Sequence, residues 1–287
     1  MNDGSSSEPR PAAGGAGGVR AAAAPRWPAD ARGQADAGGP ESAGGTAGTP
    51  RVGRGRPVDL RLYCLVDPAA SAGRPLVDVA LAAVAGGATI VQYRDKLSAT
   101  GAMVETARAL VAALAGSGVP LLVNDRVDVA LAAGAAGVHV GQDDMAVADA
   151  RRLLGPDALL GLSLNSVAEA EAAELGLLDY VCGQCVFATA SKADAPPPIG
   201  LSGIAAIADA VRRRAPGLPV GAISGITAGN AGSVIAAGID GVAVISAIGA
   251  AADPERAARA LRAAVDAALA GRAPSAAAPQ RLEDLDR

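Results

Sequence analysis

The chain has 287 residues, and 51% of them are apolar while only 2% are aromatic, so its core must be built from Ala, Val, Leu and Ile. The formal net charge of −4 argues against nucleic-acid binding, which would need a basic surface. The sequence has no apolar run of about 18 residues that could span a membrane. Its three cysteines lack the spacing of a disulfide scaffold and suit the reducing cytoplasm.

Both ends of the chain have compositions that support no core. Residues 1–57 are mostly Gly, Ala, Pro, Ser and Arg, and residues 272–287 combine prolines with a charged end. Such segments bury too little apolar surface to offset their ordering entropy. We expect a disordered extension at residues 1–57, which could also arise from a misassigned start codon, and a flexible tail at residues 272–287. Residues 58–271 then form one domain of barrel size.

Between these ends, short apolar runs typical of strands alternate with Ala- and Leu-rich helical stretches. The predicted strands are Leu60–Val66, Ala88–Tyr93, Pro120–Val123, Gly137–Val140, Leu159–Ser163, Tyr180–Cys185, Pro219–Ile223 and Gly241–Ile245. The clearest predicted helices are Met103–Ala115, Ala146–Leu154, Ser166–Leu175, Leu201–Arg214 and Pro254–Ala270. This alternation predicts an α/β fold, a single (β/α)₈ TIM barrel. An open doubly wound sheet is the alternative, but Asp67-Pro68 follows the first strand where a Gly-rich dinucleotide loop would be needed.

Polar residues end the second predicted strand. Gln92, Arg94 and Lys96 alternate along the chain, so their side chains share one face. If Val91 packs outward against helices, that face is the inside of the sheet, where an unpaired cation is costly. An anionic ligand such as phosphate or diphosphate would stabilise this cluster. Solvated charges at a surface strand end are the alternative.

Polar residues also follow the other predicted strands, as a barrel enzyme requires of its C-terminal strand ends. In chain order they are Asn124, Asp125 and Arg126; His139, Gly141, Gln142, Asp143 and Asp144; Ser163; Thr189, Ser191 and Lys192; Ser224 and Gly225; and Ser246. Because the parallel strands of a barrel all end at one rim, we expect these side chains to surround a single active site.

Seven sequence segments occur in an order that resembles the thiamine phosphate synthase family. They are VQYRDK, NDRVDVAL, GVHVGQDD, FATASK, PIGLSG, ISGI and GVAVISAI. The resemblance covers the domain from about Leu60 to Ala270. It implies a Mg²⁺-dependent barrel transferase that joins 4-amino-2-methyl-5-hydroxymethylpyrimidine diphosphate to a thiazole phosphate or its carboxylated form, releasing diphosphate and thiamine phosphate.

The resemblance also assigns roles to individual residues. Asp125 and Asp144 match the metal ligands, and carboxylate oxygens suit Mg²⁺. The matching catalytic positions are Arg94, Lys96, Ser163 and Lys192. The matching substrate-binding positions are Gln92, Arg94, Lys96, Asn124, Ser163, Thr189, Ser191, Lys192, Gly225, Ile245 and Ser246. The expected partners are thus small-molecule substrates, with no nucleic acid and no membrane, and a homo-oligomer is compatible with the sequence.

Departures from the family pattern leave a second function open. Gln184 and Cys185 stand where the pattern has Gly and Pro, and Ser224 replaces the first Gly of a Gly-Gly pair. A thiazole tautomerase-like or non-catalytic phosphate-binding paralogue of the same barrel is therefore an alternative. Asp residues at strand–helix junctions also commonly cap helices, which is an alternative role for Asp125 and Asp144.

Two further features need an interpretation. Cys182 and Cys185 form a C-x-x-C pair, which is redox-active or metal-binding in other proteins. Redox pairs lie at a helix N-terminus that lowers a thiol pKa, whereas this pair lies along a predicted strand. A thiol–disulfide oxidoreductase is therefore a remote alternative. His139 is the only histidine in the sequence, and we expect it to have a structural, hydrogen-bonded role.

Overall fold

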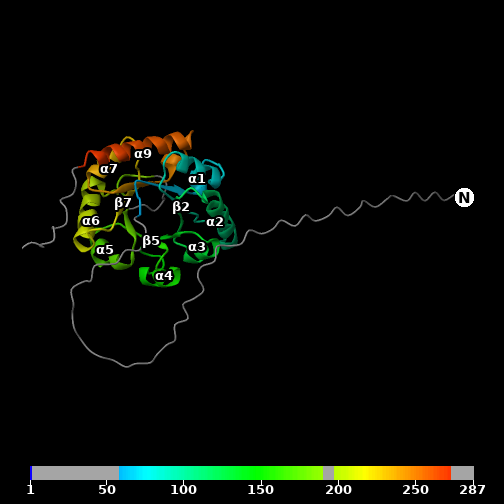
Figure 1. Ribbon diagram of the computed structural model, residues 1–287, viewed down its shortest axis with the longest axis horizontal. Coiled ribbons are helices and arrows are strands. Elements are labelled where there is room, and N and C mark those ends of the chain that lie inside the picture. The colour runs from blue at the N-terminus through cyan, green and yellow to red at the C-terminus, as the bar shows by residue number, and fades with distance from the viewer. Residues whose placement is uncertain (2–57, 190–196, 273–287) are drawn as a thin grey trace, which may run out of the picture. The chain divides into compact units, whose positions relative to one another are not determined.

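The described part of the chain is a closed barrel of parallel strands surrounded by helices (Figure 1). The computed structural model describes Met1 and residues 58–189 and 197–272. The expectations for residues 1–57 and for a tail beyond Arg272 lie outside the described residues. The eight strands are hydrogen-bonded in sequence order, and β1 pairs with β8 to close the sheet. The predicted TIM barrel is confirmed.

Helices and strands alternate along the chain. The strands are β1 (Leu62–Val66), β2 (Ile90–Tyr93), β3 (Leu121–Asn124), β4 (Gly137–Val140), β5 (Leu159–Leu164), β6 (Tyr180–Gly183), β7 (Val220–Ile223) and β8 (Gly241–Val244). The α-helices are α1 (Leu76–Ala85), α2 (Thr100–Leu114), α3 (Val127–Ala133), α4 (Val147–Leu154), α5 (Val167–Ala172), α6 (Gly200–Arg214), α7 (Ala231–Ala236), α8 (Ser246–Gly249) and α9 (Pro254–Ala270). The 3₁₀ helices are η1 (Pro68–Ala70) and η2 (Leu175–Leu177).

Side-chain alternation along the strands divides the core into two layers. In β1, Leu62 and Cys64 pack outward with the helices, whereas Tyr63 and Leu65 belong to a smaller cluster inside the barrel. Gln92 of β2 is only 1% exposed and faces the interior with them. The same alternation therefore decides which polar side chains can reach a ligand inside the barrel.

The predicted boundaries lie within about three residues of the observed ones, and two of the differences have a clear backbone cause. Strand β6 ends at Gly183 rather than at Cys185, because Cys185 adopts a left-handed conformation with φ of 59°. The predicted helix Ser166–Leu175 is divided, because Ala173 is extended after α5 and a separate 3₁₀ turn, η2, begins at Leu175. No ranges were predicted for the helices α1, α3, α7 and α8.

None of the helices in the described ranges has both the length and the apolar character needed to cross a membrane.

A buried arginine, Arg151, bonds to the segments that lead into strands β5 and β6. Arg151 of α4 is 8% exposed, and its Nη1 donates to the carbonyls of Ala158 at 2.7 Å and Gly155 at 3.0 Å. Its Nη2 donates to Leu177 O at 2.9 Å and to Asp179 Oδ2 at 2.6 Å. The guanidinium thus satisfies a buried carboxylate and three backbone carbonyls away from the strand ends that carry the predicted site.

We expect Arg151→Ala to lower the free energy of unfolding by about 3–5 kcal/mol, because it removes the ion-pair partner of the nearly buried Asp179 carboxylate. Denaturant unfolding measures this loss. Arg152→Ala is the matched control, since the side chain of Arg152 is 71% exposed in its ion pair with Asp149, and such pairs contribute about 1 kcal/mol or less. Equal losses in the two variants would contradict this role for Arg151.

Candidate active site

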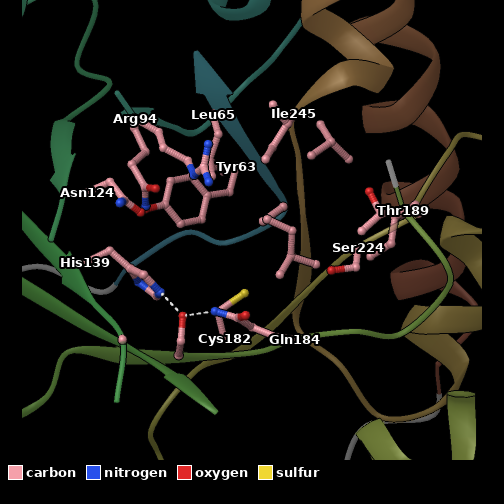
Figure 2. A pocket seen from close by; sticks show the side chains of 18 of the residues that line it. Tyr63, Leu65, Arg94, Asn124, His139, Cys182, Gln184, Thr189, Ser224 and Ile245 are labelled. Carbon is pink, nitrogen blue, oxygen red and sulfur yellow. Dashed lines mark hydrogen bonds between the residues drawn. The ribbon is translucent and has the colours of Figure 1, made fainter. Parts of the chain in front are cut away.

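A cavity of about 840 Å³ opens at the C-terminal ends of the strands (Figure 2). The predicted site residues that line it are Gln92, Arg94, Lys96, Asn124, Asp125, Asp144, Ser163, Thr189, Gly225, Ile245 and Ser246. The predicted Ser191 and Lys192 lie outside the described residues. Barrel closure therefore brings every described candidate to one cavity, although the candidates come from seven different strand ends.

Two carboxylates and a lysine meet at the ends of β2, β3 and β4. Burial, together with a hydrogen bond to Asp144, raises the pKa of Asp125, while Lys96 opposes that rise through its own hydrogen bond. Asp144 Oδ2 accepts a hydrogen bond from Gly141 N at 2.7 Å. Two acidic side chains held this close repel each other when both are ionised, unless a cation lies beside them.

This carboxylate pair fits a hard divalent cation. Mg²⁺ is commonly held by one or two carboxylates, with waters and substrate phosphates completing its coordination. The described residues contain no group of three or more His, Cys, Asp and Glu side chains that could form an all-protein metal cage. Asp125 and Asp144 could therefore hold Mg²⁺ jointly with an anionic ligand, as the sequence analysis expects.

Arg94 is fixed by a carboxylate that sequence analysis missed. Its Nη1 donates to Asp67 Oδ2, and Asp67, which follows β1, is 5% exposed. Asp67 Oδ1 also accepts from Ala69 N at 2.8 Å, so the carboxylate is anchored by the start of η1. The Asp67-Pro68 pair, a typical helix start, was the available signal. Arg94 is thus oriented toward the cavity before any ligand binds.

Unusual backbone conformations gather at this rim. Asp125, Cys185 and Ser224 have φ of 61°, 59° and 92°, in the left-handed region that non-glycine residues rarely adopt. Gly225 has φ of 65°, and an added Cβ would lie 2.5 Å from Ala188 O. Such strain persists only where the surrounding structure fixes it, and it concentrates at functional sites.

His139 lies inside the barrel below the charged rim (Figure 2). Its Nδ1 is 2.8 Å from the Tyr180 hydroxyl, and its Nε2 is 2.9 Å from Ser163 Oγ. Burial lowers the pKa of His139 to about 4, although the charge of Asp144 acts in the opposite direction. The imidazole is therefore neutral near pH 7, and the expectation that His139 is hydrogen-bonded is confirmed.

Further polar side chains extend this interior network. Gln184 Nε2 donates to Ser163 Oγ, and Gln92 Nε2 donates to the Tyr63 hydroxyl. The Tyr63 and Tyr180 hydroxyl oxygens are 2.9 Å apart. Sequence analysis missed both tyrosines, because a tyrosine within an apolar strand reads as ordinary packing.

The C-x-x-C pair lacks the properties of a redox site. Cys182 and Cys185 are both buried, and burial raises the pKa of Cys182 to about 12. Since the thiolate is the reactive form, Cys182 is a poor nucleophile near neutral pH. Cys182 instead packs with Tyr63 and Tyr180 in the inner cluster.

Fold and site together define a (β/α)₈ barrel protein whose rim gathers cationic side chains beside a pair of carboxylates. Residues 62–248 match the family model described as thiamine monophosphate synthase. The thiamine-phosphate synthase of Agrobacterium fabrum is 50% identical over 196 residues, which cover 68% of this chain and 89% of that protein. The thiamine-phosphate synthase of Xanthobacter autotrophicus is 53% identical over 201 residues, covering 70% and 93%.

A solved structure agrees with these matches. Thiamine phosphate pyrophosphorylase from Pyrococcus furiosus superposes with a TM-score of 0.66 at 37% identity, covering 74% of this chain and 98% of that one. This chain therefore belongs to the thiamine monophosphate synthase family, as its sequence motifs predicted.

The neutral state of His139 predicts a pH-dependent stability. The ordinary pKa of histidine is near 6.5, so between that value and about 4 the unfolded chain binds a proton that the folded protein does not. This contribution to stability is present above the unfolded pKa and is lost as the pH falls. We expect a loss of about 2 kcal/mol in the free energy of unfolding between pH 7 and pH 5.

Denaturant unfolding of the unaltered chain and of His139→Gln at pH 7 and pH 5 measures the contribution of His139 to the free energy of unfolding. Other groups, including Asp125, titrate in both proteins, so the difference between the two pH dependences isolates the imidazole. The same pH dependence in both proteins would mean that His139 titrates in the fold as it does in the unfolded chain, and would contradict a lowered pKa.

Proposed function

We propose that this chain condenses 4-amino-2-methyl-5-hydroxymethylpyrimidine diphosphate with a thiazole phosphate, giving thiamine phosphate and diphosphate. One observation carries the proposal: a carboxylate pair and two cationic side chains line one part of a cavity whose lining also includes Gly225, which has a φ of 65°. Family membership supports the same reaction. The carboxylated thiazole phosphate is a second candidate for the acceptor substrate.

The diphosphate would bind where Arg94 and Lys96 line the cavity beside the carboxylate pair. Asp125 and Asp144 would hold Mg²⁺, which neutralises charge on the departing diphosphate when it is bound. Arg94 is held by Asp67 and so needs little reorganisation to contact an anion. Lys192 would add another cation, from the loop after β6 and outside the described residues.

The proposed reaction breaks the bond between the pyrimidinylmethyl carbon and the diphosphate oxygen, and the thiazole nitrogen then adds to that carbon. The substrate supplies its own nucleophile, so the protein needs no strong base. Its task is to place positive charge and hydrogen-bond donors around the leaving group, and each such preorganised contact can contribute about 3–4 kcal/mol. His139 is buried and neutral, which is consistent with a reaction that needs no strong base from the protein.

The pyrimidine end of the donor would lie deeper in the barrel. Gln92, Asn124 and Ser163 line the cavity there and offer amide and hydroxyl groups. The interior position of Gln92, only 1% exposed, suits a contact to a ring rather than to a charged phosphate.

The thiazole phosphate would bind at the ends of β7 and β8. Backbone N–H groups of the loops after these strands commonly bind phosphate in TIM barrels. Gly225 lines the cavity with a φ of 65°, and glycine is required there because an added Cβ would lie 2.5 Å from Ala188 O. Ile245 and Ser246 lie at the start of α8, and Thr189 and Ser191 would reach the phosphate from the loop after β6.

Incubating the purified full-length chain with both substrates and Mg²⁺, and then detecting thiamine phosphate by chromatography, tests the proposal directly. Formation of thiamine phosphate and diphosphate in equal amounts is expected. Binding of both phosphates without product would instead favour the non-catalytic paralogue, since Gln184 and Ser224 line the cavity where the family pattern has glycine. Turnover of the thiazole phosphate alone would favour the tautomerase-like alternative.

The proposed metal site yields a graded mutational prediction. Asp125→Ala and Asp144→Ala each remove one carboxylate from the pair, and we expect each to lower kcat by about 10²–10³-fold, the usual effect of deleting one preorganised electrostatic contact. The KM for thiazole phosphate should change little, because that substrate would bind at β7 and β8. Steady-state kinetics with a Mg²⁺ titration measure both quantities.

Asp143→Ala is the matched control, since Asp143 is the adjacent acidic residue and is exposed. Its loss should cost much less activity. Full activity in the presence of EDTA, or equal losses at Asp143 and Asp144, would remove Asp125 and Asp144 as the metal ligands.

A further inference from the structure

We propose that a buried chain of hydrogen bonds across the barrel interior is a directional relay that makes the Ser163 hydroxyl a donor toward the cavity. Its members are six uncharged side chains in contact: Gln92, Tyr63, Tyr180, His139, Ser163 and Gln184. Tyr63, Tyr180 and His139 act as positioning residues for the two ends that line the cavity. The choice of ligand for those ends rests on the function proposed above.

The direction of the relay begins at Gln92. Its Nε2 donates to the Tyr63 oxygen, and the other polar partner of that hydroxyl within the described residues is Tyr180, at 2.9 Å. A buried donor without a partner costs about 1–3 kcal/mol, so Tyr63 donates its proton to Tyr180. The Tyr180 hydroxyl then accepts from Tyr63 and donates its own proton to His139 Nδ1, 2.8 Å away.

The tautomer of His139 determines which atom donates in its hydrogen bond to Ser163. A neutral histidine has one ring proton, and since Nδ1 accepts, that proton lies on Nε2. His139 Nε2 therefore donates to Ser163 Oγ at 2.9 Å, and Gln184 Nε2 donates to the same oxygen. A hydroxyl has two lone pairs and one proton. Both lone pairs of Ser163 are used inside the protein, so its proton is left to point into the cavity.

The opposite end of the relay presents an acceptor. Gln92 lines the cavity, and its Oε1 is the buried side-chain oxygen that has no hydrogen-bond partner among the described residues. The two ends thus offer a carbonyl acceptor at Gln92 and a hydroxyl donor at Ser163. A heterocycle with an amino group and a ring acceptor atom would match both, as an aminopyrimidine does. Reversing one end requires reversing every bond of the relay, so the two ends are coupled.

Close packing holds the aromatic rings of the relay in place. The rings of His139 and Tyr180 stack with centroids 5.4 Å apart, and Tyr63 meets Tyr180 edge-on at 5.9 Å. Gly161 of β5 lies beneath them, where an added Cβ would be 2.1 Å from Tyr180 Cζ and 2.5 Å from His139 Nδ1. Burial also raises the pKa of both tyrosines, so their hydroxyls keep the protons that the relay needs.

The relay predicts one tautomer for the single histidine of the chain. In untagged protein labelled with ¹⁵N-histidine, the imidazole gives one pair of ring nitrogen signals at neutral pH. We expect Nε2 to carry the proton and Nδ1 to have the shift of an unprotonated acceptor. A protonated Nδ1, or rapid exchange between the two tautomers, would overturn the direction of the relay. This measurement needs neither a variant nor an active enzyme.

Tyr180→Phe tests whether the direction matters for the site. The variant keeps the ring but removes the donor to Nδ1, so the imidazole should lose its single tautomer. We expect kcat/KM for the pyrimidine diphosphate to fall by about tenfold, the size of one coupled polar contact, while the KM for thiazole phosphate stays unchanged. Tyr93→Phe is the matched control, because Tyr93 is equally buried in β2 but its hydroxyl donates to Asp95 outside the relay.

A triple comparison separates the relay from general damage to the fold. If the two ends are coupled, the fold-loss in kcat/KM of the double variant Gln92→Ala/Ser163→Ala should differ by about tenfold from the product of the fold-losses of the two single variants. In the Tyr180→Phe background, the fold-loss of the double variant should equal that product. Unchanged coupling in the Tyr180→Phe background, in protein with a normal thermal midpoint, would overturn the relay. If the unaltered chain makes no thiamine phosphate, the proposed function fails, and the histidine tautomer still decides the relay.

Discussion

Hydrogen bonding between β1 and β8 is the constraint on which the site depends, because it brings the C-terminal ends of all eight strands to one rim. Asp67 after β1 can then hold Arg94 after β2, and Lys96 can reach Asp125 after β3. No short segment of the chain contains these pairs. The charged groups are close because neighbouring parallel strands end side by side, and closure then places them on the same rim as the ends of β5 to β8.

The barrel separates charge from neutral polarity by depth. Ionised groups lie at the rim, where water and a ligand can solvate them, and the side chain of Lys96 is 53% exposed there. Below them the interior polar groups are uncharged and hydrogen-bonded to one another, as buried polar groups must be. His139 marks the boundary, because burial lowers its pKa more than the nearby Asp144 raises it. A neutral interior lets hydrogen-bond direction, rather than charge, organise the deeper part of the cavity.

Sequence periodicity predicted every strand and most of the polar rim residues, although not Asp67, because apolar alternation and polar strand ends are local signals. Helix α9 was predicted with its observed ends, since Asp253 caps it and Pro254 begins it. The end of β6 was missed, because the left-handed conformation of Cys185 depends on contacts with β7. Tyr63 and Tyr180 were missed for a related reason: their partners are 117 positions apart in the sequence, and only closure of the barrel joins them.

The departures from the family pattern at Cys185 and Ser224 become one structural feature when they are considered together. A proline at position 185 could not adopt the φ of 59° that Cys185 has, and it would have no backbone N–H. Cys185 does have that donor, and its N lies 3.2 Å from Ser224 Oγ, a hydroxyl that the glycine of the pattern would lack. The two residues therefore compensate for each other across β6 and β7. Gln184, whose amide donates to Ser163 Oγ, directly precedes Cys185 in the sequence.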